Sequence, residues 1–130
     1  MRRDMDLIRE LLLKIDSLDI EPGGTTRALR PSDPELKIGS YTGDQVDYHL
    51  ELLIDAGLVE GSCSAVDRFF HITKLSWAGD DFLASVRDPE IWRQTKEGAK
   101  KAGGFTVELL GDLAKGLIKT QIKKHTGVEL

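Results

Sequence analysis

The segment YHLELLIDAGLVEG, residues 48–61, constrains the fold more than any other part of the chain. It has the pattern of an amphipathic helix that stops at Gly57 and is followed by a strand. Just upstream, Thr42 and Gln45 have the spacing of a capping box, so the sequence predicts a helix over 42–56. Small DNA-binding domains carry such a passage where a helix enters the groove, which raises the question of whether this chain binds DNA.

The region before this helix divides into a regular and an irregular part. Residues 4–18 carry apolar side chains at helical spacing, which predicts an amphipathic helix with one buried face: Leu7, Ile8, Leu11, Leu12, Ile15 and Leu18. Residues 19–41 hold three prolines and three glycines, so no helix is expected to cross them. Within them, RALR (27–30) and ELKIG (35–39) are short enough to be strands or extended arms.

The region after this helix predicts a β-hairpin and three more helices. LVEGSC (58–63) and RFFHITKL (68–75) favour strands, with a turn through SAVD (64–67). Ser76 is the expected cap of the next helix, and its buried side is predicted as follows: Trp77 or Ala78, Phe82, Leu83 and Val86. Asp88-Pro89 begins another helix, which Gly103-Gly104 ends, and a last helix is expected over about 105–124.

This order of elements predicts an α+β, mainly helical fold: a winged-helix-like domain over 1–87, with the hairpin as the wing, followed by C-terminal helices. Only IGSYTG is available for the first helix of a helix-turn-helix pair, so that helix would be vestigial. Residues 1–87 carry a net charge of −6 and residues 88–130 a net of +2. The shift suggests that 88–130 form a helical extension, which packs on the domain or on a partner chain.

Three segments also resemble a family of small bacterial and prophage proteins known only as a domain of unknown function. They are RRDMDLIRELLLKID at the start, YHLELLIDAGLVEG in the middle and ITKLSWAGDDFLASVRDPEIW after the hairpin. Ser76 stands where the family usually has Thr, and Asp80 stands where His is expected. The resemblance implies a winged-helix-like fold and a mobile-element setting in bacteria, and it brings no activity and no site residues.

Composition narrows the function classes. The 130 residues are 40% hydrophobic and 31% charged, as in a globular protein, and no stretch has the roughly 20 apolar residues of a membrane span. The charged N-terminus does not fit a signal peptide, so a cytoplasmic protein without membrane contact is expected. Cys63 is the only cysteine, which excludes an internal disulfide and a cysteine-based zinc site.

No residue pattern indicates catalysis, a metal or a cofactor. His49, His71 and His125 lack paired spacing and are interpreted as ordinary polar or partly buried residues. Ser62 and Ser64 flank Cys63 without a G-x-S-x-G elbow or an evident base. The Gly-Gly pairs lack phosphate-loop motifs, so neither an enzyme nor a cofactor is predicted.

Two binding functions remain, and the residues favour different ones. The fold order favours a DNA-binding regulator, whose candidate residues lie on the wing and the arginine loop: Arg27, Arg30, Arg68 and Lys74. The 42–56 helix has no Lys or Arg but four carboxylates, which would repel phosphates. That charge favours an adaptor that binds a basic protein through this acidic face, with Asp44, Asp47 and Glu51 as candidates.

The last helix carries a long apolar stripe: Val107, Leu110, Leu113, Ala114, Leu117, Ile118 and Ile122. Either it folds back to close the core of its own chain, or part of it meets a copy in a homodimer. Leu110, Leu113 and Leu117 are the candidate contact residues for the second alternative.

Overall fold

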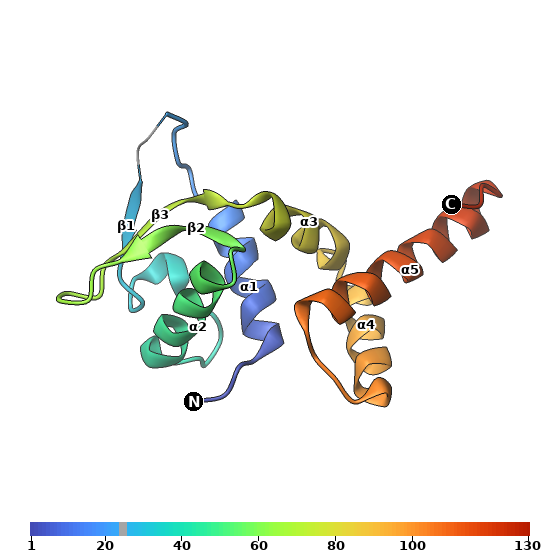
Figure 1. Cartoon of the computed structure of the whole chain (residues 1–130), viewed down its shortest axis with the longest axis horizontal. Helices are drawn as coiled ribbons and strands as arrows, with labels where there is room; N and C mark the ends of the chain where they lie inside the picture. The colour runs from blue at the N-terminus through green and yellow to red at the C-terminus, as the bar shows by residue number, and fades with distance from the viewer. Residues whose placement is uncertain (24–25) are drawn as a thin grey trace. The chain divides into compact units, whose positions relative to one another are not determined.

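A computed structural model describes residues 1–23 and 26–130 of the chain. The fold is α+β and mainly helical, with one small antiparallel sheet, as the sequence predicts (Figure 1). The chain forms two compact units, Met1–Asp80 and Asp81–Leu130. The boundary between the units follows Asp80, inside helix α3 (Trp77–Val86). The charge shift in the sequence places the domain boundary later, between residues 87 and 88.

The first unit holds two α-helices and three strands: α1 (Met5–Asp16), β1 (Arg27–Leu29), α2 (Gly43–Asp55), β2 (Val59–Cys63) and β3 (Phe70–Leu75). The strands lie in the order β1-β3-β2, and both pairs are antiparallel. The hairpin predicted between 58 and 75 is therefore present as β2 and β3, and RALR is confirmed as strand β1.

The core of the first unit lies between one face of the sheet and the apolar faces of α1 and α2. Phe70 and Ile72 of β3 are fully buried, whereas His71 between them is only half-buried on the other face. Leu7, Leu11 and Leu50 are fully buried too, which confirms the apolar faces predicted for both helices. Burial of these side chains stabilises the unit, since removal of apolar surface from water is the main driving force of folding.

The ends of α2 form as the sequence predicts. Thr42 and Gln45 make a complete capping box, in which each side chain bonds the other residue's backbone N–H at 3.2 and 2.9 Å. Gly57 follows the helix with a left-handed φ of +74°, which a residue with a Cβ adopts only with strain. The Ser76 hydroxyl then donates to the Gly57 carbonyl and accepts from the Gly79 N–H at 3.0 Å, so one side chain links the end of α2 to the start of α3.

The prediction that Trp77 or Ala78 lies on the buried side of α3 is wrong. Trp77 is 89% exposed and Ala78 is exposed, so neither is on the buried side of α3. The helix instead presses Gly79 against the chain at Leu58, where a Cβ on Gly79 would lie 2.0 Å from the Leu58 carbonyl oxygen. That approach turns Trp77 and Ala78 outward.

Of the two alternatives for ELKIG (35–39), a strand or an extended arm, the strand does not form, and the first two residues belong to a 3-10 turn, η1 (Pro34–Leu36). This turn and the loop after it stand where a helix-turn-helix would have its first helix. The winged-helix architecture therefore stays a prediction.

The second unit contains the end of α3, then α4 (Pro89–Ala102) and α5 (Val107–Thr126). Phe82, Leu83 and Val86 of α3 are buried, as predicted. The Asp88 carboxylate caps α4 by accepting from the N–H groups of Glu90 and Ile91, both at 2.9 Å, and Pro89 occupies the first turn. Gly103 ends α4 with a φ of +83°.

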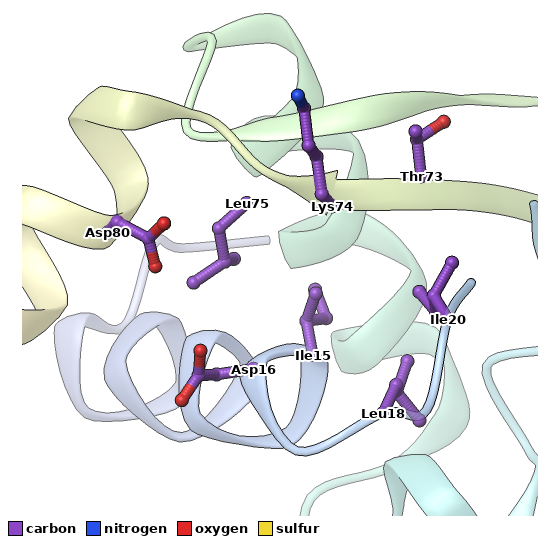
Figure 2. Close-up of a pocket in the computed structure, with 8 residues that line it drawn as sticks. All are labelled: Ile15, Asp16, Leu18, Ile20, Thr73, Lys74, Leu75 and Asp80. Carbon is purple, nitrogen blue, oxygen red and sulfur yellow. The ribbon is translucent and has the colours of Figure 1, made fainter. Parts of the chain in front are cut away.

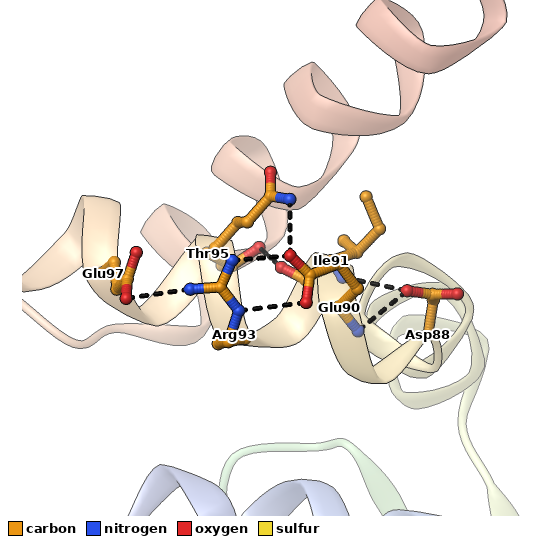
Figure 3. A network of polar contacts seen from close by, with 7 residues as sticks. Asp88, Glu90, Ile91, Arg93, Thr95 and Glu97 are labelled. Atoms are coloured by element: carbon orange, nitrogen blue, oxygen red, sulfur yellow. Dashed lines mark hydrogen bonds and ion pairs between the residues drawn. The ribbon is translucent and has the colours of Figure 1, made fainter.

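The exposed side of α4 carries a polar network between neighbouring turns (Figure 3). Arg93 pairs with Glu90 at 2.6 Å and with Glu97 at 3.0 Å, and Gln94 donates to Glu90 at 2.9 Å. The hydrogen bonds from Arg93 and Gln94 lower the pKa of Glu90 to about 2. All these partners are three or four residues apart, so the network supports one helix and links no distant parts of the chain.

Candidate functional site

The exposed face of α2 carries a row of carboxylates. Asp44, Asp47, Glu51 and Asp55 are spaced by three and four residues, which places them along one side of the helix over roughly 16 Å. We call this row the acidic ridge. Val46, Leu50 and Leu53 occupy the buried side of the same helix, so burial of the apolar side fixes the ridge at the surface.

A single arginine from the hairpin turn lies against the middle of the acidic ridge. Arg68 donates from Nε to Asp47 Oδ2 at 3.0 Å, from Nη2 to Asp47 Oδ1, and from Nη1 to Glu51 Oε1 at 3.1 Å. The fork on Asp47 is the bidentate geometry that suits guanidinium and carboxylate. The hydrogen bonds to Asp47 and then Glu51 raise the pKa of Arg68 above its already high ordinary value.

The backbone of Arg68 has a φ of 57°, which residues with a Cβ seldom adopt. The residue stands at the end of the turn between β2 and β3, where Arg68 N–H donates to the Ser64 carbonyl at 2.8 Å. The turn thus projects the guanidinium onto the ridge, and the three side-chain hydrogen bonds help to offset the strain of this backbone conformation.

The structure therefore joins residues that the sequence assigns to different functions. Arg68 is a DNA-binding candidate, whereas Asp47 and Glu51 are protein-interaction candidates, and the three form one ion-pair cluster. Sequence reasoning misses the cluster because 21 and 17 residues separate the partners. One signal was available: Arg68 is the only basic residue in the turn of a hairpin that directly follows a helix with four carboxylates.

The other DNA-binding candidates also have partners. Arg27 lies 3.8 Å from Glu35, and Lys74 lies 3.6 Å from Glu60, with both partners of each pair well exposed. The guanidinium of Arg30 stacks over the ring of Phe69 at 4.4 Å from its centre. These exposed pairs are weak, because water and salt screen them, so they hold the cations less firmly than the ridge holds Arg68.

Of the remaining ridge carboxylates, Asp44 and Asp55 form no ion pair within the residues that the structure describes. Both are exposed at the two ends of the ridge. Together with Asp47 and Glu51, and with Arg68 as the single cation, the ridge keeps a net charge of about −3 by simple formal counting at neutral pH.

A second polar cluster joins α1 to α2 and is structural. His49 Nε2 accepts from the Asp4 N–H at 2.8 Å, and His49 Nδ1 donates to the Gln45 carbonyl at 2.7 Å. The Tyr41 hydroxyl donates to Asp4 Oδ2 at 2.8 Å, while Asp4 Oδ1 caps α1. Burial of Tyr41, with the hydrogen bond to Asp4, raises the pKa of its phenol to about 12. His49 is thus a hydrogen-bonded core residue, more deeply buried than its interpretation as an ordinary polar or partly buried histidine implies.

A pocket of about 200 Å³ opens between the end of α1 and the end of β3 (Figure 2). Its apolar lining consists of Ile15, Leu18, Ile20 and Leu75, and its polar lining of Asp16, Thr73, Lys74 and Asp80. None of the ridge residues lines it, so the pocket and the ridge are separate features of the first unit.

Within residues 1–23 and 26–130, no group of three or more His, Cys, Asp or Glu side chains is placed to hold a metal ion. Over the same residues, none of the helices combines the length and the hydropathy that crossing a bilayer requires.

The candidate dimer residues on α5 differ in exposure. Leu110 is fully buried in the second unit, together with Ala114, so Leu110 is not on a surface that a partner could reach. Leu113 and Leu117 are half-exposed. Leu110 and Ala114 therefore close a core within their own unit, whereas the other residues of the stripe are half-exposed.

Comparison with known proteins gives a family and a relative. The model of the family described as "Hypothetical protein (DUF2513)" matches residues 2–105, which end just before α5. An "Uncharacterized protein" of Haemophilus influenzae is 28% identical over 125 residues, which cover 94% of this chain and 99% of that protein. No solved structure matches the chain.

Proposed function

The chain belongs to the family described as "Hypothetical protein (DUF2513)", and for this member we propose a non-catalytic function as a protein-interaction adaptor. The acidic ridge of α2 would bind a basic segment of a partner protein. The observation that carries the proposal is the Arg68 cluster, in which the ridge already holds a guanidinium by three hydrogen bonds. Arg68 occupies the position that an arginine of the partner would share or take over.

The charges of the ridge suit a basic partner better than DNA. Phosphate neutralisation by Lys and Arg supplies most non-specific affinity for DNA, and the ridge offers four carboxylates in its place. Arg68 cannot face a phosphate while it is bound to Asp47 and Glu51, because all three of its guanidinium nitrogens are engaged there. A basic peptide gains from the same field that repels a duplex.

The wider setting of the proposal comes from the sequence. The resemblance to prophage proteins implies a bacterial mobile-element protein with a winged-helix-like first unit, and a cytoplasmic location belongs to the same proposal. A homodimer through α5 belongs to the same proposal, because two copies would offer two ridges to one partner and raise its apparent affinity.

A DNA-binding regulator that acts through the wing and the arginine loop is the second candidate, supported by the position of the hairpin after α2. The two functions predict opposite effects of one substitution, Arg68→Ala, on binding affinity. Arg68→Ala removes the internal competitor from the ridge, so an adaptor should bind a basic peptide more tightly. The same change removes a wing cation, so a DNA-binding protein should bind every duplex more weakly.

Fluorescence anisotropy with a labelled oligoarginine peptide and with mixed-sequence duplex DNA, both at low salt, tests the proposal. We expect the peptide to bind and the double variant Asp44→Asn/Asp55→Asn to weaken it by about tenfold, a loss of roughly 1.4 kcal/mol. The control variant Asp19→Asn/Glu97→Gln removes the same charge from exposed positions that are not part of the ridge and should leave affinity unchanged. If both variants weaken peptide binding equally, the binding depends on the net charge of the protein and not on the ridge. Duplex binding that Arg68→Ala abolishes would favour the DNA-binding regulator.

A further inference from the structure

The pocket of the first unit combines an apolar interior with a charged rim (Figure 2). Four aliphatic side chains, two buried and two half-exposed, make up the apolar lining: Ile15, Leu75, Leu18 and Ile20. The exposed residues of the lining are all charged: Asp16, Lys74 and Asp80. The pocket therefore suits a group that has both an apolar part and a charge.

A bulge in β3 decides which residues of this strand face the pocket. The register with β2 skips Thr73, which therefore has no partner on that strand. This extra residue shifts the alternation of side chains by one position, so Ile72 and Leu75 are both buried and Lys74 is exposed. A regular strand would turn Lys74 toward the core together with Ile72. The bulge thus supplies an apolar lining residue and keeps an amine out of the pocket.

The charges that remain at the rim are negative. The Lys74 amine lies 3.6 Å from a Glu60 carboxylate oxygen on the neighbouring strand, and Figure 2 shows it directed away from Asp16 and Asp80. Among the residues that the structure describes, Asp80 forms no ion pair. Helix α1 ends at Asp16, and the partial negative charge of a helix C-terminus adds to that of the carboxylates. The rim is therefore suited to a cation.

The backbone that carries Asp80 is held firmly. The Asp80 N–H donates to the Ser76 carbonyl at 2.9 Å, and the Ser76 hydroxyl bonds both the Gly57 carbonyl and the Gly79 N–H. Gly79 packs directly on the backbone of Leu58. A ligand that pairs with Asp80 would therefore meet a preorganised rim, which lowers the entropic cost of binding.

We propose that this pocket binds a primary alkylammonium group, that is, a short aliphatic chain that ends in an ammonium. The chain lies against the four aliphatic side chains, and the ammonium faces the carboxylates of Asp16 and Asp80. A lysine side chain of a partner protein and a free aliphatic diamine both present this chemistry. The inference does not depend on the acidic ridge, because no ridge residue lines the pocket.

The size of the pocket agrees with a short chain. Its volume is about 200 Å³. An apolar cavity of about 150 Å³ holds one benzene molecule in another protein, so this pocket has room for a chain of roughly six to eight heavy atoms. Nucleotides and larger cofactors need more space, since pockets for such ligands usually span about 300–1,000 Å³.

The charge of the rim separates an alkylammonium from other short chains. An aliphatic carboxylate would bring its negative charge to Asp16 and Asp80, which would repel it. A neutral chain would gain from the apolar lining alone and would leave both carboxylates without a partner. Only a cationic chain uses both parts of the pocket.

Methyl NMR titration of the wild-type chain at neutral pH tests the proposal with three ligands of matched chain length. We expect n-pentylammonium to shift the methyl signals of the aliphatic lining, with a Kd roughly in the millimolar range for a ligand of this size. n-Pentanol and n-pentanoate should bind at least about fivefold more weakly. Equal or tighter binding of either one overturns the proposal, as does an absence of shifts with n-pentylammonium at tens of millimolar.

Two double variants test the rim against the net charge of the protein. Asp16→Asn/Asp80→Asn should weaken n-pentylammonium binding by about fivefold, because both exposed carboxylates lose their charge. Asp44→Asn/Asp55→Asn removes the same charge from the acidic ridge and should leave this binding unchanged. Equal weakening by the two variants overturns the site. Amide NMR spectra show whether each variant keeps the fold, and the comparison of ligands on the wild-type chain needs no variant.

The source of the alkylammonium group is tested with cadaverine and with a lysine residue blocked at both its α-amine and its carboxyl group. Tighter binding of the blocked lysine assigns the pocket to a lysine of a partner protein, whereas tighter binding of cadaverine assigns it to a free diamine. If neither displaces n-pentylammonium, no source of the proposed chemistry fits and the proposal is overturned.

Discussion

The two units use their polar residues differently. In the first unit, the strongest polar contacts join residues far apart in the chain: His49 with Asp4, and Arg68 with Asp47. In the second unit, Arg93 and its partners lie within one exposed helix face, and the pair that joins two helices, Lys115 with Asp81, is well exposed and therefore weak. Long-range polar contacts fix how elements pack, whereas contacts within one helix support only that helix. The first unit should therefore respond more strongly to single substitutions.

The charged surfaces of α2 and α5 differ in how firmly their charges are paired. The acidic ridge is partly neutralised by Arg68 from the neighbouring hairpin. On α5, Lys115 pairs with Asp81 at 3.2 Å and Lys123 pairs with Glu129 at 3.0 Å, and all four side chains are well exposed. Exposed pairs such as those of α5 are screened by water and salt, so they are weaker than the bidentate contact of Arg68 with Asp47.

The largest difference in stability is expected between alanine substitutions at two helix glycines, Gly79 and Gly116. Gly79→Ala would place a Cβ 2.0 Å from the Leu58 carbonyl oxygen, where only movement of the backbone can relieve the overlap. We expect it to cost at least about 3 kcal/mol in urea unfolding, at the upper end for overpacking. Gly116→Ala meets open space in α5 and should stabilise the chain by about 0.5–1 kcal/mol. Equal effects at the two positions would contradict the close approach of α3 to Leu58.

The next largest difference in stability is expected between alanine substitutions at two helix leucines, Leu50 and Leu117. Leu50 of α2 is 1% exposed, so Leu50→Ala should cost about 2–5 kcal/mol through lost burial and a residual cavity. Leu117 of α5 is half-exposed, and Leu117→Ala should cost less than about 1 kcal/mol. Thermal melts at a fixed protein concentration measure both, and wild-type stability in Leu50→Ala would mean that the faces of α2 are misassigned.

A smaller effect concerns the pH dependence of the first unit. The pKa of Tyr41 is raised from its ordinary value of 10.0 to about 12, because burial and the Asp4 carboxylate disfavour the phenolate. The unfolded chain releases this proton first, so the contribution of Tyr41 is complete below pH 10 and is lost as pH rises toward 12. Tyr41→Phe should flatten the fall in stability over this window in denaturant titrations. An unchanged slope would place Tyr41 outside the Asp4 cluster.

The smallest effect is expected on α4. Glu90→Gln removes the ion pair with Arg93 on a fully exposed helix face, where water and salt screen such pairs and leave them little effect on stability. Thermal unfolding should therefore change by about one degree or less. A loss as large as that of Leu50→Ala would show that the network of Figure 3 does more than support its own helix.

The sequence by itself determined the local features of this protein. Helix caps at Thr42, Ser76 and Asp88, the helix end at Gly57, and the apolar faces of α1 and α2 all follow from residues within a few positions of one another. Such features depend on backbone hydrogen bonding and on helical periodicity, which short segments already express.

The tertiary structure alone decided where distant side chains meet. It buried His49 against Asp4, turned Trp77 outward because Gly79 packs on Leu58, and placed Arg68 on Asp47 and Glu51. It also divided the apolar stripe of α5 into the buried Leu110 and the open Leu117. These outcomes depend on how elements pack and on the direction of one turn, which no spacing along the chain encodes.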